Sequence, residues 1–216
     1  VSRPNRFLAQ VKTADGVQTC HVKNTGRCAE LLLPGAPVWL QRFGADAKRK
    51  TKFDLIAVQK GALLLNIDSQ APNAAAREFL ASGGLGWIPS VLRPEYTWGD
   101  SRFDFYLEHG GRRCLAEVKG VTLEEDGTAL FPDAPTLRGI KHLEGLSRAA
   151  AQGFACCVLF VVQFSPAAAF APNRRTHPFA DALRAARDAG VRVLAYDCAV
   201  TPESMVLRAP VPVTGL

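Results

Sequence analysis

The pair Gly110-Gly111 and the two runs that it joins constrain the fold of this chain more than any other feature. Ser101–Glu108 and Cys114–Leu123 alternate apolar and polar residues, which is the period of a β-strand. Consecutive glycines supply the positive φ angles that a two-residue hairpin turn requires. The sequence therefore predicts a β-hairpin, and the turn fixes which residues of its two strands lie opposite each other.

The predicted register brings like charges together. It places Asp104 opposite Glu117 and Arg102 opposite Lys119 on one face of the hairpin. Like charges directly opposed destabilise a sheet by roughly 0.2–1 kcal/mol per pair, and a hard cation shared by the two carboxylates would offset that cost. Lys119 could then hold an attacking water or a phosphate. A solvated face, on which diagonal Asp–Lys and Arg–Glu contacts cancel the repulsion, explains the pattern equally well.

The second face of the hairpin is predicted to be core, because every residue on it is apolar. These residues are Phe103, Phe105, Leu107, Cys114, Ala116 and Val118. Another acid-x-Lys triplet, Asp46-Ala47-Lys48, has the same residue types in a polar stretch. No hairpin presents a second acid opposite that triplet, so only Glu117-Val118-Lys119 is a candidate site.

Positive charge is concentrated in the first third of the chain. Residues 1–68 carry eleven Lys and Arg against five acids, whereas residues 69–216 carry fifteen of each sign, so the first part holds the entire net charge of +6. A small basic module of this kind is typical of a protein that meets a polyanion. Its densest cluster should form an exposed loop or strand edge that contacts DNA phosphates, and comprises Lys48, Arg49, Lys50 and Lys52.

The chain divides into two predicted domains, residues 1–68 and residues 69–216, with the junction at Asp68–Asn73. The first domain reads as a small β-barrel, because short strands alternate with glycine-containing turns. The expected strands are Arg6–Lys12, Gln18–Lys23, Pro37–Phe43, Phe53–Gln59 and Ala62–Ile67.

The second domain reads as an α/β sheet flanked by helices. Asn73 is expected to cap a helix that ends at Ala81, and an irregular segment then leads to Glu95 and the hairpin. The elements expected after the hairpin are helices at Leu137–Gln152 and His177–Ala189 and strands at Cys156–Gln163 and Val191–Asp197.

The helix expected at Leu137–Gln152 has two distinct faces when it is projected at 100° per residue. The apolar face comprises Ile140, Leu143, Leu146 and Ala150, and the cationic face comprises Arg138, Lys141, His142 and Arg148. Cationic helix faces are commonly just solvated. Directly after a carboxylate hairpin, this one could instead hold the phosphates that flank a reacting phosphate.

Cysteine spacing and hydropathy point to a soluble protein of the reducing cytoplasm. The six cysteines show no C-x-x-C spacing, and Cys156-Cys157 lie inside an apolar run, so we expect buried thiols rather than disulfides or a zinc site. No basic-apolar leader is present at the N-terminus, and the longest apolar stretch is too short to span a bilayer.

A series of short motifs follows in order along nearly the whole chain. They are Arg6-Phe7, Asn24-Thr25-Gly26-Arg27, Lys50-Thr51, Glu95, Ser101-Arg102-Phe103-Asp104-Phe105, Glu117-Val118-Lys119, Phe131-Pro132-Asp133-Ala134 and Arg138-Gly139-Ile140-Lys141-His142-Leu143. Together these motifs resemble the sugar fermentation stimulation protein A (SfsA) family of bacteria and archaea. The chain departs from the family pattern at Tyr96-Thr97-Trp98, which stands in place of the usual Val-Lys-Tyr.

The resemblance implies an α/β (α+β) chain of two domains, an OB-like barrel followed by a domain similar to the PD-(D/E)xK nucleases, which resemble restriction endonucleases. It also implies that Glu95, Asp104, Glu117 and Lys119 hold the acid, metal-ligand and lysine positions. Together with the Val118 carbonyl, the acids would bind one or two Mg²⁺ or Mn²⁺ ions. Arg102, Arg138 and Lys141 would contact neighbouring DNA phosphates.

Two functions compete on these grounds. Metal-dependent phosphodiester hydrolysis by a sequence-independent DNA-binding protein follows from the site residues. The alternative is a DNA-binding regulator of sugar metabolism without catalysis, since the SfsA family is described as nonspecific DNA binders and possible regulators of maltose metabolism. Nothing in the chain resembles a helix-turn-helix reader of base edges, so recognition of a specific operator is not expected.

Overall fold

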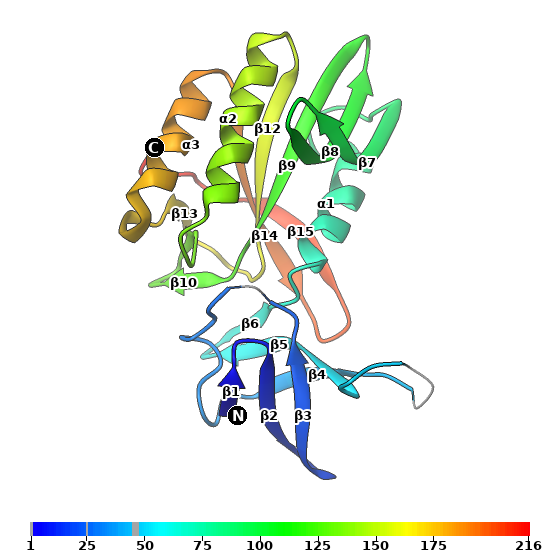
Figure 1. The fold of residues 1–216 in the computed structure, drawn as a ribbon, viewed down its shortest axis with the longest axis vertical. Coiled ribbons are helices and arrows are strands. Elements are labelled where there is room, and N and C mark those ends of the chain that lie inside the picture. The colour runs from blue at the N-terminus through cyan, green and yellow to red at the C-terminus, as the bar shows by residue number, and fades with distance from the viewer. Residues whose placement is uncertain (1, 25, 45–47) are drawn as a thin grey trace.

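A computed structural model describes residues 2–24, 26–44 and 48–216, and Figure 1 shows a β-rich N-terminal part below a larger α/β part. Thr25 of the Asn24–Arg27 motif and the Asp46-Ala47 part of the second acid-x-Lys triplet lie outside the described residues. The last strand of the N-terminal part ends at Asn66, and the first helix begins at Ala71.

The N-terminal part contains all five predicted strands and one more at its start. The neighbouring strands follow the order β1-β2-β3-β5-β4, and β6 also pairs with β5. Alternation of buried residues along β2 and β3 places Ala9, Val11, Cys20 and Val22 in the core. The strand bounds are β1 Ser2–Asn5, β2 Leu8–Thr13, β3 Gly16–Val22, β4 Val38–Arg42, β5 Phe53–Lys60 and β6 Leu63–Asn66.

The C-terminal part is built on a six-stranded mixed sheet in the order β15-β14-β12-β9-β8-β7. β12 runs parallel to both β9 and β14, whereas β7, β8 and β9 form an antiparallel meander. The strand bounds are β7 Val91–Trp98, β8 Ser101–His109, β9 Arg112–Val121, β12 Ala155–Val162, β14 Arg192–Val200 and β15 Met205–Pro210.

Strand β7 falls where the sequence predicted an irregular segment. It contains Pro94 and, at Glu95, a non-glycine residue with a positive φ of 56°. Proline in a strand is tolerated at a sheet edge, where its missing N–H faces solvent, and β7 is the edge strand beside β8. Local strand propensity therefore disfavours a strand here, but pairing with β8 stabilises it.

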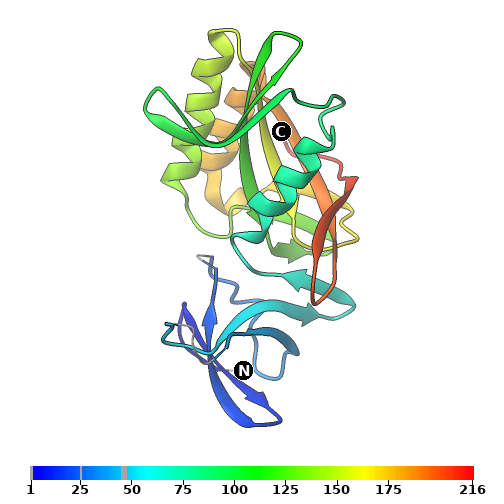
Figure 2. The ribbon, with the colours of Figure 1, turned by 90° about the vertical axis from the view of Figure 1, so that its right-hand side faces the viewer.

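Helices cover both faces of this sheet, with α1 on one side and α2 and α3 on the other (Figures 1 and 2). Gly145 lets α2 approach β8 closely, because a Cβ atom there would lie 3.0 Å from Phe103 Cζ. The helix bounds are α1 Ala71–Ala81, α2 Leu137–Ala151, the short 3₁₀ helix η1 Arg174–Thr176 and α3 His177–Asp188.

A small second sheet, which the sequence did not predict, lies beside the barrel. β11 pairs antiparallel with β10 and parallel with β13, although it is far from β13 in sequence. The bounds are β10 Leu123–Glu125, β11 Thr128–Phe131 and β13 Ala169–Pro172.

Burial confirms the interpretation of the cysteines as core residues. All six carry free, buried thiols, and burial raises the pKa of Cys28, Cys156 and Cys198 to about 12. Among the described residues, no helix is long and apolar enough to cross a membrane.

Candidate functional site

The hairpin register agrees with the glycine turn over most of its length. Gly110 and Gly111 both adopt positive φ angles, and the pairs run from His109 opposite Arg112 to Phe105 opposite Ala116, as predicted. The ladder stops there, one step before Asp104 and Glu117. The two acids therefore do not form the predicted ladder pair, because β8 and β9 separate at this point.

The residues of the predicted apolar face are buried as expected, but the expectation that the polar face is solvated is wrong, because helices bury both faces. Phe105, Leu107, Cys114, Ala116 and Val118 pack with residues of α1, as one shared face. Phe103 instead packs in the other cluster, together with Tyr106, Leu115 and the apolar residues of α2.

The Asp104 carboxylate lies where the two strands part. Its Oδ2 accepts a hydrogen bond of 2.7 Å from the Val118 backbone N–H, and its Oδ1 accepts one of 2.8 Å from Asn73 Nδ2 on α1. Burial raises the pKa of Asp104, and the charge of Glu117 raises it further. The Asp104 side chain thus accepts the Val118 N–H in place of a backbone carbonyl of the ladder. It is fixed between the strands, close enough for the charge of Glu117 to raise its pKa.

Glu117 is 2% exposed and is held from the α2 side. Its Oε1 accepts hydrogen bonds from Lys119 Nζ, at 2.5 Å, and from His142 Nδ1. Burial alone would raise the pKa of Glu117, but His142 and Lys119 outweigh burial and hold the pKa below its ordinary value. Its Oε2 is buried and has no hydrogen-bond partner among the described residues. A charged oxygen without a partner is costly in a protein interior, so Oε2 is the atom for which a ligand is expected.

His142 was placed on the solvated cationic face by the helical projection, and that placement is wrong. It is 6% exposed, and its ring packs edge-on against Phe103. The buried stripe of α2 runs through Gly139, His142, Leu143, Leu146 and Ala149, so the helix is rotated relative to the projection. Leu143 and Leu146 are buried as predicted, whereas Ile140 and Ala150 are only partly buried.

Asn73 was expected to be the N-cap of α1, but the N-cap residue is Gln70, three residues earlier, and the helix begins at Ala71. The Asn73 side chain points instead to Asp104. Asn73 on α1 and His142 on α2 therefore hold the two acids from opposite faces of the sheet. Neither role was available from spacing, since both contacts join elements that are remote in sequence.

Glu95 and Arg102 pair with each other rather than with the buried acids. Arg102 Nε lies 2.8 Å from Glu95 Oε2, and both side chains are more than half exposed. Among the described residues, no group of three His, Cys, Asp or Glu side chains is placed to hold a metal ion. Asp104, Glu117 and the Val118 backbone are thus the candidate ligands that the structure brings together.

The basic residues 48–52 lie in the segment that connects β4 to β5. Lys48, Lys50 and Lys52 are exposed. Arg49 instead forms an ion pair with Asp54, which is 1% exposed, and its guanidinium carbon lies 3.9 Å from the centre of the Phe43 ring. Arg49 thus has a structural role that its neighbours do not share.

The remaining predicted DNA-binding residues lie on the outer face of α2. Arg138 is exposed near the start of the helix. Lys141 Nζ and an Arg148 guanidinium nitrogen lie 3.3 Å and 2.7 Å from the carboxylate of Asp100, which is itself exposed in the turn between β7 and β8. The cationic face is therefore partly neutralised, and Arg138 is the member most open to an anion.

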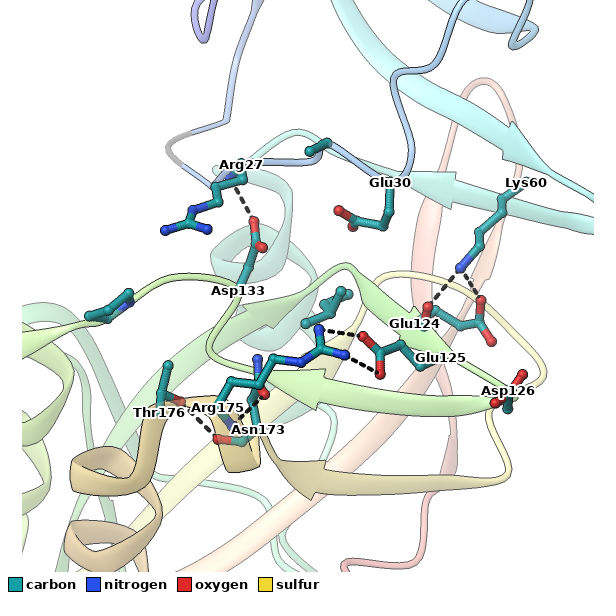
Figure 3. Close-up of a pocket in the computed structure, with 13 residues that line it drawn as sticks. Arg27, Glu30, Lys60, Glu124, Glu125, Asp126, Asp133, Asn173, Arg175 and Thr176 are labelled. Carbon is teal, nitrogen blue, oxygen red and sulfur yellow. Dashed lines mark hydrogen bonds and ion pairs between the residues drawn. The ribbon is translucent and has the colours of Figure 1, made fainter.

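A cavity of about 780 Å³ lies between the two parts of the chain, and Figure 3 shows its ionic contacts. Lys60 of the barrel donates to Glu124 Oε2 at 2.5 Å, and Arg175 lies 2.9 Å from Glu125. Asp133 Oδ2 accepts the backbone N–H of Arg27 at 2.5 Å. The first and third of these contacts join the barrel to the α/β part across the cavity.

Comparison with known proteins follows the same division of the chain. Residues 1–67 match the family description "SfsA N-terminal OB domain", and residues 70–204 match "Sugar fermentation stimulation protein RE domain". The solved structure of SfsA from Pyrococcus furiosus in complex with Ca²⁺ is similar, with a TM-score of 0.87 at 24% identity over 98% of this chain and 92% of that one.

Sequence relatives give the same assignment. A sugar fermentation stimulation protein homolog of Desulfitobacterium hafniense is 53% identical over 95% of this chain and 90% of its own length. A homolog from Clostridium beijerinckii is 45% identical over 96% and 92%. The fold is thus an OB-like barrel followed by a restriction-endonuclease-like α/β domain, as expected, and the chain belongs to the SfsA family.

Proposed function

We propose that this protein binds nucleic acid without sequence preference and hydrolyses phosphodiester bonds at a site formed by Asp104, Glu117 and Lys119. The two acids would hold a divalent metal, and Lys119 would contact the phosphate or the attacking water. One observation carries the proposal: within the part of the chain that the structure describes, the buried Oε2 of Glu117 has no hydrogen-bond partner, although Lys119 and His142 donate to the other oxygen of the same carboxylate. This geometry is suited to an acid that orients one oxygen toward a ligand.

The donor set fits Mg²⁺ or Mn²⁺. These hard cations prefer oxygen ligands, and Mg²⁺ is commonly held by one or two protein carboxylates together with water and substrate phosphates. Asp104 and Glu117 supply two carboxylates and Val118 a backbone carbonyl. The Ca²⁺ in the Pyrococcus furiosus structure supports a divalent ion in this family. Glu95 would join the set only by leaving Arg102.

A bound divalent ion would supply Lewis-acid polarisation of the phosphoryl oxygens. Lys119 carries the positive charge nearest to Glu117, and its side chain is 15% exposed, so it can contact a phosphate or an attacking water. His142 and Asn73 hold the two carboxylates in place through hydrogen bonds. Such fixed orientation lowers the cost of reorganisation during reaction.

Nucleic-acid affinity would come from the exposed cations of both domains. Lys48, Lys50 and Lys52 lie on the barrel, and Arg138 lies on α2. Contacts between lysine or arginine and phosphates give binding that does not depend on sequence and weakens with salt. Arg102, Lys141 and Arg49 would contribute less, because each is already paired with an acid.

The alternative function is DNA binding without catalysis, as part of a regulatory role in sugar metabolism such as maltose use. The family description, sugar fermentation stimulation, favours it. The two functions differ in the role of the buried acids. A nuclease uses a carboxylate oxygen without a hydrogen-bond partner to bind a metal, whereas a regulator that only binds phosphates does not require such an oxygen beside a lysine.

Calorimetry of Mn²⁺ binding together with a nuclease assay distinguishes the two functions. Asp104→Ala should abolish Mn²⁺ binding, whereas Lys119→Ala should retain the ion and lose cleavage by about 10²–10⁴-fold. Asp100→Ala removes an exposed acid of the same domain and should leave both properties unchanged. If the wild-type protein binds no Mn²⁺ and cuts no DNA or RNA, the nuclease function is wrong and DNA binding alone remains.

A further inference from the structure

A second cavity, of about 350 Å³, opens beside Lys119. Residues of two sequence motifs that take no part in the candidate metal site line this cavity. Asn24 and Gly26 line it from the barrel, and residues 131–136 line it from the segment between β11 and α2. Val118, Lys119 and Gly120 of β9 form the part of its wall that adjoins the candidate metal ligands.

Asp133 fixes the shape of this cavity. Its Oδ2 accepts hydrogen bonds from the backbone N–H groups of Arg27, at 2.5 Å, and Cys28, at 3.2 Å, and so joins residues 131–136 to the barrel loop. Lys119 and Asp133 are the charged side chains among the described residues that line the cavity. The two amides donate to the Asp133 carboxylate, and Lys119 pairs with Glu117, which is not part of the lining. The cavity is therefore preorganised, and Lys119, whose ammonium has three donors, is the lining cation that can donate to a phosphate.

The other walls of the cavity suit a nucleobase. Leu123, Leu130 and Phe131 provide apolar surface, and Thr122 and Ser69 provide hydroxyl groups that can both donate and accept hydrogen bonds. Ligand sites typically combine an apolar lining with a few convergent polar groups in this way. The volume of 350 Å³ lies at the low end of the range for ligand pockets and admits one nucleotide but not a base pair.

The neighbouring large cavity limits how far a strand can extend. The two cavities share Leu123, Asp133 and Pro135. Acids outnumber cations in the larger one, which is lined by Glu30, Glu124, Glu125, Asp126 and Asp133 against Arg27, Lys60 and Arg175. A further phosphate would be repelled there, so the smaller cavity holds one base while its phosphate stays at Lys119.

We propose that this cavity binds a single unpaired nucleotide next to the scissile phosphate, so that the substrate is single-stranded or locally unpaired nucleic acid. The inference rests on the proposed function, whose site it extends. A duplex would have to release a base from its stack to enter, at a cost of a few kcal/mol. Single-stranded substrates avoid that cost.

Ala134→Phe tests the inference, because a phenyl ring at Ala134 would fill a cavity that this residue lines, without altering Asp104, Glu117 or Lys119. Wild-type protein with Mn²⁺ should cut an oligothymidine strand faster than a blunt duplex. The variant should lose about 10-fold or more of that activity, since misplaced substrates react slowly, while its Mn²⁺ affinity stays unchanged. Ala189→Phe, at the exposed end of α3, is the matched control. Equal cleavage of strand and duplex, unaffected by Ala134→Phe, would overturn the inference and leave the proposed function standing.

Binding provides a readout that does not depend on cleavage. Thymidine 5′-monophosphate should bind the wild-type protein more tightly than inorganic phosphate does, and Ala134→Phe should remove the difference while Ala189→Phe retains it. Ala134→Leu, a smaller change, serves the same purpose if the phenylalanine variant does not fold. If the wild-type protein cuts no substrate, the proposed function fails and this binding comparison decides the inference: equal affinity for the nucleotide and for phosphate would refute it.

Discussion

Lys141 and His142 are neighbours in helix α2, yet they contact acids in opposite environments. Lys141 pairs with Asp100, and both side chains are at least half exposed. His142 pairs with Glu117, and both are buried. Exposed ion pairs contribute little because water screens them, whereas removal of one partner from a buried pair leaves an uncompensated charge. Burial, and not the types of residue, therefore separates a solvated surface from a candidate site.

Glu117→Gln should show the largest effect that this comparison predicts. The amide keeps the size of the side chain but removes the charge that would attract a divalent ion. We expect loss of Mn²⁺ binding and a decrease in cleavage of about 10²–10⁴-fold. Asp100→Asn is the exposed counterpart and should change neither Mn²⁺ affinity in calorimetry nor cleavage rate. Equal effects of the two substitutions would show that burial does not distinguish the sites.

His142→Ala should lower the stability of the protein by about 3–5 kcal/mol, because it leaves Glu117 buried with one partner fewer. Lys141→Ala, one residue away, should leave the free energy of unfolding unchanged. Denaturant unfolding of both variants measures the contrast. A small loss of stability in His142→Ala, with normal Mn²⁺ affinity, would mean that Lys119 alone compensates the carboxylate.

The pH dependence of stability extends the comparison to the domain interface. Glu124 is 8% exposed; burial alone would raise its pKa, but the hydrogen bonds from Lys60 and the Gly127 N–H hold the pKa below its ordinary value. A lowered pKa contributes stability above the unfolded pKa of about 4.3, and this contribution is lost as the pH falls through the folded pKa.

Thermal midpoints measured from pH 7 to pH 3 test this expectation. Glu124→Gln should be less stable than the wild type near neutrality, and the two midpoints should converge as the pH falls below about 4. Glu125→Gln, which removes the more exposed partner of Arg175, should follow the wild-type profile. A constant offset between Glu124→Gln and the wild type at every pH would indicate a steric effect of the amide rather than lost charge.

The basic segment of the barrel should give the smallest effects. Replacement of Lys48, Lys50 and Lys52 by Gln should weaken binding to unrelated DNA sequences about equally, and should reduce the slope of log K against log salt by up to roughly 0.7–0.9 per lost phosphate contact. Arg49→Gln should mainly lower the thermal midpoint, because the buried carboxylate of Asp54 loses its ion pair with Arg49. Fluorescence anisotropy at several salt concentrations measures the first effect, and an unchanged slope would place the DNA surface elsewhere.

Local patterns predicted most of the strands and helices. The five barrel strands, the glycine hairpin, α2 and α3 all occur near their predicted bounds, because period-2 and period-3.6 patterns and glycine turns are encoded by neighbouring residues. Some of the missed strands depend on a remote partner or contradict local propensity. β13 pairs with β11, which lies about forty residues earlier in the sequence. β7 contains Pro94, and proline is unfavourable in a strand by local propensity.

The sequence by itself determined the residue types of the site and the register of the hairpin, since Gly110 and Gly111 set the first pairs and alternation extends them. Only the tertiary structure decided which oxygens are satisfied. The strands part before Asp104, Asn73 reaches it from α1, and α2 turns His142 inward to Glu117. These contacts join segments that are distant along the chain, and packing of helices on both faces of the sheet sets them, which no local pattern encodes.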